Sequence, residues 1–205
     1  DEANWQRVVA FGGIPLLLRL ASSTNRHIQR RAALELGSST ADPATQRLVL
    51  QAGGLRPLIE GVLSSPHHDV QESGLAAVAN LSAAETCWAE IVELGGVLPV
   101  VSFLSSQDSP ASQLHAATII ANISADATGV AALGGEEVIS RLIDMSECAG
   151  GAHQAALLEA ITRALAHLIR DEAYARDLYT HNHSLEPFMP LFSSPDAAVQ
   201  ASASL

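Results

Sequence analysis

The stretch "LAAVANLSAAETCWAEIVELGG", residues 75–96, joins an apolar, Ala-rich run that ends in Asn-Leu-Ser to a pair of glycines. A similar phrase recurs along the chain, and Gly pairs stand at residues 12–13, 53–54, 95–96 and 134–135. The pairs are separated by 41, 42 and 39 residues, and periods of this length are typical of helical repeat arrays. The sequence therefore predicts a repeat protein.

The composition favours a folded chain that does not insert into a membrane. Of the 205 residues 48% are hydrophobic, which is enough to bury a core. Arg19 and Asn80 interrupt the longest apolar runs, so none approaches the roughly 18 to 20 residues needed to cross a bilayer. The opening DEANWQ has no initiator Met and no targeting signal, so we expect additional repeats or domains in the intact protein.

The cysteine count bears on the location of the protein, and the charge bears on the class of its partner. Cys87 and Cys148 are too few for a disulfide framework or a zinc site, which favours a reducing, cytoplasmic location. The net charge of −11 disfavours nucleic acid. Residues 1–56 carry seven Arg and four acids, whereas residues 57–140 carry ten acids and no Arg. A charged partner would therefore present a segment of basic character to the middle repeats.

Each unit follows a helical period, as with Leu98, Val101 and Leu104, and no alternating strand pattern is present. A first helix, such as "TQRLVLQAGG", is predicted to end at the Gly pair, where the glycine supplies a positive φ. Pro57 and Pro99 then begin a second helix. In "SSPHHD" and "SSQDSP", Ser, Asp and Pro are expected to cap or initiate a third. The fold class is all-α.

The segments "HDVQESGLAAVANLSA" and "ASQLHAATIIANISA", with the preceding Gly-x-x-Pro, resemble armadillo repeats. The resemblance implies a right-handed α-solenoid with three helices per repeat. It covers the whole chain as one array with approximate repeats at residues 1–40, 41–83, 84–124, 125–170 and 171–205, the last incomplete.

Two units depart from this pattern. The fourth has Val138 where Pro is expected and extra residues around "SECAGGAHQ", which predict a longer loop between its second and third helices. The fifth has His183-Ser184 in place of the Gly pair and stops inside its third helix, so a further repeat or cap should follow.

In the armadillo family the third helices line a concave groove, and an Asn on each holds the backbone of an extended peptide. An amide can do this because it offers both a donor and an acceptor. Asn80 and Asn122 occupy that column here, with Ser38 and His167 at the corresponding places of the first and fourth units. The alternative is that each Asn satisfies nearby backbone at a helix end.

Nuclear-import adaptors of the family add a Trp four residues before the Asn. Here those positions are Leu34, Ala76, Thr118 and Arg163, so the aromatic wall is missing and an import receptor is not expected. Trp5 and Trp88 lie in first helices and are predicted to pack between repeats. Further groove candidates lie one or two turns earlier: Arg30, Arg31, Glu72, Ser73, His115 and Glu159.

No motif predicts catalysis, a cofactor or a metal. His67, His68, His181 and His183 fall in predicted loops without a second pair of ligands. A Gly-rich phosphate loop, a nucleophile elbow and paired carboxylates are all missing from the sequence, so an enzyme is not expected.

The sequence therefore predicts a scaffold that binds an extended or helical segment of another protein along the third helices. Two alternatives remain open at this point. The repeats could form the substrate-recognition region of a larger enzyme, such as a U-box ubiquitin ligase. They could also be structural spacers in a permanent cytoskeletal or ciliary assembly. An obligate assembly predicts large apolar exposed patches, and a peptide binder predicts a polar groove.

Overall fold

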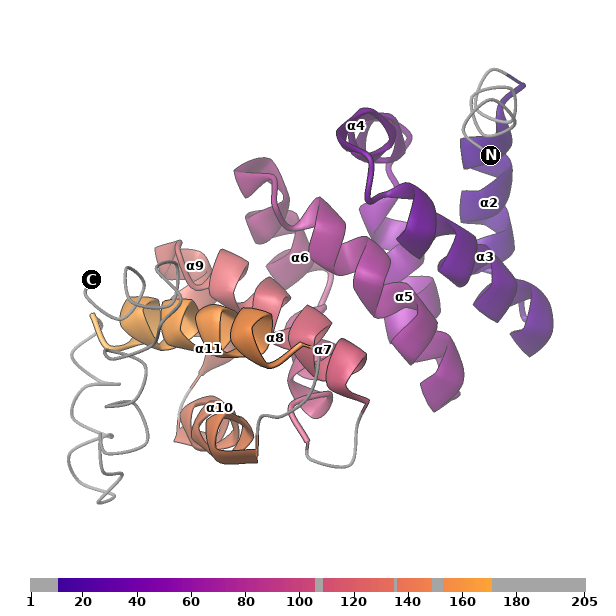
Figure 1. The fold of residues 1–205 in the computed structure, drawn as a ribbon. Coiled ribbons are helices and arrows are strands. Elements are labelled where there is room, and N and C mark those ends of the chain that lie inside the picture. The colour runs from indigo at the N-terminus through magenta and orange to yellow at the C-terminus, as the bar shows by residue number, and fades with distance from the viewer. Residues whose placement is uncertain (1–10, 106–108, 135, 149–152, 171–205) are drawn as a thin grey trace. The chain divides into compact units, whose positions relative to one another are not determined.

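A computed structural model describes residues 11–105, 109–134, 136–148 and 153–170 (Figure 1). The described residues form helices and no strands, which confirms the all-α class. The chain divides into two compact units, Asp1–Pro99 and Val100–Leu205, here called unit 1 and unit 2. The predicted repeat boundaries and the single array remain predictions, and the fifth repeat, Trp5, His181 and His183 lie outside the described residues.

The helices follow one another in the order that the repeat pattern predicts. Unit 1 contains α2 (Gly13–Ala21), α3 (Arg26–Ser39), α4 (Pro43–Gln51), the π-helix η1 (Pro57–Leu63), α5 (His68–Leu81), the short 3-10 helix η2 (Glu85–Cys87) and α6 (Trp88–Glu93). After α7 (Val97–Ser102) come α8 (Pro110–Ile123), α9 (Ala127–Leu133), α10 (Glu136–Cys148) and α11 (Gln154–Leu168). The third helices of the predicted repeats are α3, α5, α8 and α11.

The Gly pairs after α4 and α6 end these first helices by a Schellman turn. After α4, Gly53 has φ 69°, its N–H donates to Leu50 O at 2.9 Å, and Gly54 N–H donates to Val49 O at 2.9 Å. The same two bonds recur after α6, where Gly95 has φ 74° and Gly96 N–H reaches Ile91 O. The predicted positive φ at the first glycine is therefore confirmed.

The second glycine of each pair is required for a different reason, which is space. A Cβ on Gly54 would lie 2.8 Å from the carbonyl oxygen of Val49 and 3.3 Å from a methyl group of Leu18. A Cβ on Gly96 would lie 3.0 Å from the carbonyl oxygen of Ile91. The chain thus folds back against the helix it has just left, and only a residue without a side chain fits.

The starts of the third helices partly match the prediction. Ser109 caps α8 by accepting a bond from Ser112 N–H at 3.2 Å, and Pro110 occupies the first turn. The predicted cap of α5 is wrong, because His67 holds the N-cap position and its side chain makes no capping bond. His68 belongs to the first turn of α5 rather than to a loop.

A buried or half-buried glutamine ties each of three third helices to the segment before it. Gln29, Gln71 and Gln113 are spaced by 42 residues. Gln71 Nε2 donates to Ser65 O at 2.8 Å, and Gln113 Nε2 donates to Ser105 O at 2.6 Å. Gln29, which is buried, donates to two carbonyl oxygens, those of Ala21 and Gly61. These bonds satisfy backbone groups that the turns leave unpaired.

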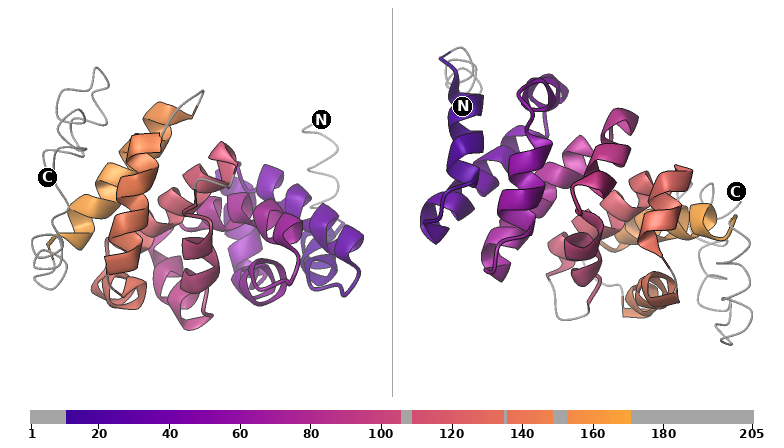
Figure 2. Two further views of the ribbon diagram at one scale, coloured as in Figure 1. Left: turned by 90° about the horizontal axis from the view of Figure 1, so that it is seen from below. Right: turned by 180° about the vertical axis from the view of Figure 1, so that it is seen from behind.

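Consecutive third helices pack side by side within each unit, α3 with α5 and α8 with α11 (Figures 1 and 2). In unit 1 a Cβ on Gly37 would lie 3.2 Å from the Cβ of Ala76, so the backbones approach closely. The neighbouring apolar side chains are buried: Leu36, Leu58, Leu75 and Val78 in unit 1, and Ile119, Ile120, Leu142 and Ile161 in unit 2.

In each of these helix pairs a polar contact joins the two helices near their C-terminal ends. Asn80 Nδ2 of α5 lies 3.3 Å from Gly37 O and 3.3 Å from Thr40 Oγ1, at the end of α3. His167 Nδ1 of α11 lies 3.2 Å from Ala121 O and 3.3 Å from Ser124 Oγ, at the end of α8.

The two contacts are equivalent in the repeat. Ala121 and Ser124 stand two 42-residue periods after Gly37 and Thr40. His167 therefore makes the contact in unit 2 that Asn80 makes in unit 1, with its Nδ1–H donating to the carbonyl oxygen of Ala121. Because the ring is half-buried, desolvation lowers the pKa of His167; the bond to Ala121 opposes this shift, and the positive charges of Arg170 and Arg163 add to it.

The longer loop predicted for the fourth repeat falls on residues 149–152, which lie outside the described residues, so it stays a prediction. The second helix of this repeat is itself long: α10 has 13 residues, whereas η1 has 7 and α7 has 6. Part of the extra length of the repeat therefore lies in the helix.

We expect replacement by alanine to lower the free energy of unfolding by different amounts at the two glycines of a pair. Gly53→Ala should lower the free energy of unfolding by about 1 kcal/mol, the cost of a positive φ, and Gly53→Asn should cost less because Asn tolerates that conformation. Gly54→Ala should cost about 2–3 kcal/mol, because the new methyl group overlaps a backbone oxygen. Urea unfolding of the three variants measures this. A loss at Gly54 no larger than that at Gly53 would contradict the close approach.

We also expect His167 to make folding sensitive to acid. Because its pKa is lowered in the folded state, the unfolded chain binds the proton more readily, so stability falls as the pH drops below about 6.5. His167→Asn keeps a donor and does not titrate, so it should lose less stability than the parent between about pH 7 and pH 5.5. His27→Asn, at an exposed position, is the control. Equal pH dependence of the parent and His167→Asn would exclude this role.

Candidate functional site

The exposed positions of α3 and α5 form one surface of unit 1, here called the unit 1 face. On α5, Asp69, Glu72, Ala76 and Asn80 recur every three or four residues, and all are half-exposed, so they share one stripe of the helix. Beside it on α3 lie the exposed Arg30, Arg31, Leu34 and Ser38. Ser73 is buried and its hydroxyl donates to Asp69 O at 2.6 Å, so it is not part of this face.

The corresponding unit 2 face combines residues of α8 and α11. It contains His115, Thr118 and Asn122 of α8 and Glu159, Arg163 and His167 of α11, all half-buried. Arg163 Nη2 donates to Asn122 Oδ1 at 3.1 Å, which shows that the two stripes meet. The predicted candidates thus lie on two faces, one in each unit. Whether either face is used in binding remains a prediction.

The contacts of Asn80 change what it can offer to a ligand. Both of its amide donors lie near acceptors at the end of α3, Gly37 O and Thr40 Oγ1. This favours the alternative that the asparagine satisfies backbone at a helix end. Within the described residues Oδ1 of Asn80 has no partner, so the side chain can still accept a bond from a ligand N–H.

The partners of Asn80 and His167 are residues that the sequence-based search for a groove missed. Thr40, Ser82 and Ser124 are spaced by 42 residues, and all three are buried. Each hydroxyl donates to a carbonyl oxygen of the last turn of its own third helix. The Ser of the repeated Asn-Leu-Ser phrase therefore hydrogen-bonds to the last turn of its own helix. At Thr40 in unit 1 and Ser124 in unit 2, the hydroxyl group also contacts a side chain of the next third helix, Asn80 or His167. The 42-residue spacing of these three hydroxyl residues is the sequence pattern that could have identified them.

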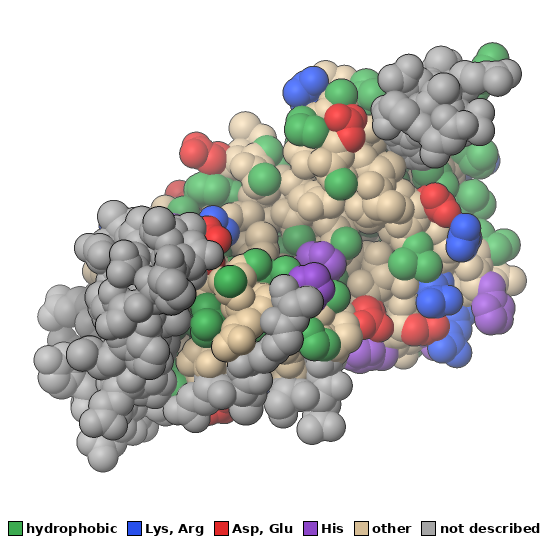
Figure 3. Space-filling model, viewed as in Figure 1, with side chains coloured by type: hydrophobic (Ala, Val, Ile, Leu, Met, Phe, Trp, Pro, Cys, Tyr) green, Lys and Arg blue, Asp and Glu red, His purple; other side chains and the backbone are tan. Residues whose placement is uncertain are grey.

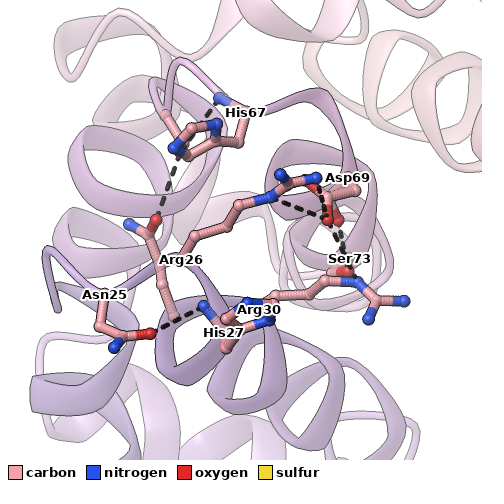
Figure 4. A network of polar contacts seen from close by, with 9 residues as sticks. Asn25, Arg26, His27, Arg30, His67, Asp69 and Ser73 are labelled. Carbon is pink, nitrogen blue, oxygen red and sulfur yellow. Dashed lines mark hydrogen bonds and ion pairs between the residues drawn. The ribbon is translucent and has the colours of Figure 1, made fainter.

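A charged cluster lies at the N-terminal ends of α3 and α5 (Figures 3 and 4). Arg26, which the sequence did not single out, holds Asp69 with Nε 3.0 Å from Oδ1 and Nη2 2.9 Å from Oδ2. The hydrogen bond from Arg26 holds the pKa of Asp69 below its usual range. Arg30 reaches the same carboxylate only at 3.7 Å, and Arg31 pairs with Glu35 at 3.0 Å. These pairs are exposed, so each contributes little to stability.

The remaining candidates on the unit 2 face have local partners or buried surroundings. Thr118 Oγ1 donates to Leu114 O at 2.7 Å, as a threonine often does within a helix. Burial lowers the pKa of His115, and the nearby His153 acts in the same direction. His115 forms no ion pair with a described carboxylate.

Two predictions about single residues outside the faces can be compared with the structure. Trp88 is half-buried, and its indole N–H donates to Ser82 O at 2.7 Å, so it joins the end of α5 to the next first helix. This agrees with a packing role. Cys87 is buried, and burial raises the pKa of its thiol, which works against thiolate reactivity.

The described residues contain no group of three or more His, Cys, Asp or Glu side chains arranged to hold a metal ion. In the same part of the chain, every helix is too short or too polar to cross a membrane.

Comparisons with known proteins bear on the fold. Residues 14–91 match the family described as Armadillo-like. No curated protein matches the chain. Among solved structures, an engineered protein from the Northeast Structural Genomics Consortium is 24% identical with a TM-score of 0.75, over 100% of this chain and 81% of that one. A computationally designed armadillo repeat protein for modular peptide recognition is 21% identical with a TM-score of 0.75, over 93% and 79%.

A designed armadillo repeat protein in complex with the peptide (KR)4 is 19% identical, with a TM-score of 0.72 over 97% of this chain and 82% of that one. At these identities the likeness establishes the fold, which is the all-α solenoid that the sequence predicted. Residues 14–91 thus match the Armadillo-like family, and the chain as a whole has the fold of the armadillo repeat solenoids.

Proposed function

We propose that this protein is a scaffold that binds a segment of another protein along its third-helix faces. The observation that carries the proposal is the polar character of both faces. Of the exposed large apolar side chains among the described residues, Leu34 is the one that belongs to either face. Ile28 lies in the first turn of α3 and Ile169 directly after α11, outside the residues that define the faces, and the others lie on other elements: Phe11, Leu16, Leu48 and Leu98. A permanent assembly would require an apolar contact surface, so polar faces favour reversible binding of a segment over a structural spacer.

Preorganisation of the face supports the same proposal. Asn80 is fixed by the end of α3, and Ser38 Oγ donates to Leu34 O at 2.8 Å. Both side chains therefore have defined positions before a ligand arrives, which lowers the entropic cost of binding. In this scheme Asn80 Oδ1 accepts a backbone N–H of the bound segment.

The positions of the acids on the helices narrow the place where a basic residue of the partner is expected. Of the acids in residues 57–140, Asp69 and Glu72 lie on a third helix, α5, and α8 has no charged residue. Arg26 already neutralises Asp69. A basic partner residue would therefore lie along α5 rather than along α8. The peptide (KR)4 bound by a designed relative is in keeping with a peptide partner.

The test is selection from a displayed library of disordered peptides, using the chain and the variant Asn80→Ala/Asn122→Ala. We expect a shared motif to be enriched by the parent and its affinity to fall about tenfold in the variant, because hydrogen bonds to the peptide backbone are lost. Asn80→Ala should also lower the free energy of unfolding by about 1 kcal/mol, because the bonds to α3 are lost.

Thr40→Val is the matched control for that stability loss. It removes the buried hydroxyl that Asn80 contacts but keeps every side chain of the exposed face and the bond from Asn80 to Gly37 O. Binding should be retained in Thr40→Val at a comparable loss of stability, as measured by urea unfolding. Equal loss of binding in both variants, or a motif indifferent to both, would argue against the proposed use of the face.

A further inference from the structure

Arg163 is a cation on the unit 2 face that no described residue neutralises. Its Nη2 donates to Asn122 Oδ1 at 3.1 Å, and its Nε is buried without a hydrogen-bond partner. Among the described residues no carboxylate comes within ion-pair distance of it. Glu159, one turn earlier on α11, does not pair with it although the spacing would allow it.

Arg141, the other half-buried arginine among the described residues, differs from Arg163. Its Nη2 lies 2.6 Å from Oε1 of Glu137 on the same helix, so its charge is compensated. A guanidinium cannot lose its proton, and a half-buried one without an anion bears an uncompensated desolvation cost. A buried N–H without an acceptor adds to this cost and is rare in folded proteins. The position of Arg163 is therefore better suited to a state in which an anion is bound.

The facing third helix brings no negative charge to Arg163, since α8, which packs against α11, carries no acidic residue over its whole length. α10, which also packs against α11, carries four acids, of which Glu137 pairs with Arg141 and Asp144 is exposed. His167 and Arg170 lie on the C-terminal side of Arg163 along the chain, and Glu159 is the carboxylate that the unit 2 face contains. Asn122 uses one of the five guanidinium donors, so others remain for a ligand.

We propose that Arg163, oriented by Asn122, binds the carboxylate of an Asp or Glu side chain in the partner segment. This inference rests on the proposed function and adds a specificity residue to it. Guanidinium and carboxylate match in geometry and charge, and such charge-assisted bonds are shorter and stronger than neutral ones. The subsite is opposite in sign to the one expected along α5, so the partner carries charges of both signs.

The experiment selects peptides from a displayed random library with the parent chain, Arg163→Gln, Arg163→Glu and the control Arg170→Gln. Arg170 is exposed and follows α11, so its substitution removes the same charge from outside the contact with Asn122. The parent and Arg170→Gln should enrich Asp or Glu at one fixed position of the motif. Arg163→Gln should lose that preference, with about tenfold weaker binding of the parent's best peptide.

Arg163→Glu supplies the decisive result, because it should select Lys or Arg at that same position. Retention of the acidic preference in Arg163→Glu, or a parent motif without an acid, would overturn this inference and leave the proposed function standing. Failure of the parent to enrich any peptide would overturn both. Thermal unfolding of Arg163→Gln should occur at or above the parental temperature; a lower temperature with an unchanged peptide preference would show that Arg163 is only structural.

Discussion

The close side-by-side packing of consecutive third helices is the constraint on which the other features depend. Gly37 opposite Ala76 lets α3 and α5 approach closely, and this distance allows Asn80 to reach the end of α3. The same relation brings His167 of α11 to the end of α8. Side chains one turn away from these contacts are left on an exposed face. The positions available for binding therefore follow from the positions that hold the helices together.

Much of the fold could be predicted because its determinants are local in sequence. A Gly pair after a helical run indicates a Schellman turn, and both glycines are needed, one for its φ and one for its lack of a side chain. The length of α10 could not be predicted in this way. The residues "SECAGGAHQ" contain turn formers, yet α10 continues through Cys148, so part of the added length extends the helix. A repeat pattern shows that residues have been inserted but not which element receives them.

The candidate faces were predicted less completely, because their chemistry depends on residues that are distant in sequence. Asn80 was recognisable by type, but its donors are directed to Gly37 and Thr40, about one repeat earlier. Arg26 was missed because its partner, Asp69, lies 43 residues away. Arg163 was predicted as a groove candidate from its place in the repeat, but its buried Nε and its lack of an ion pair among the described residues became evident only from the packing. Composition gives the number of charges, whereas packing decides which of them are compensated.

The spacing of the contacts between third helices also bears on how the chain folds. Asn80 meets a carbonyl group 43 residues earlier, and His167 meets one 46 residues earlier. Contacts of this kind close loops of one repeat, whatever the total length of the array, so the entropy of loop closure does not grow as repeats are added. Folding can then begin at any adjacent pair of third helices and spread to its neighbours. The relative contact order falls as such a chain lengthens, a topology associated with fast folding.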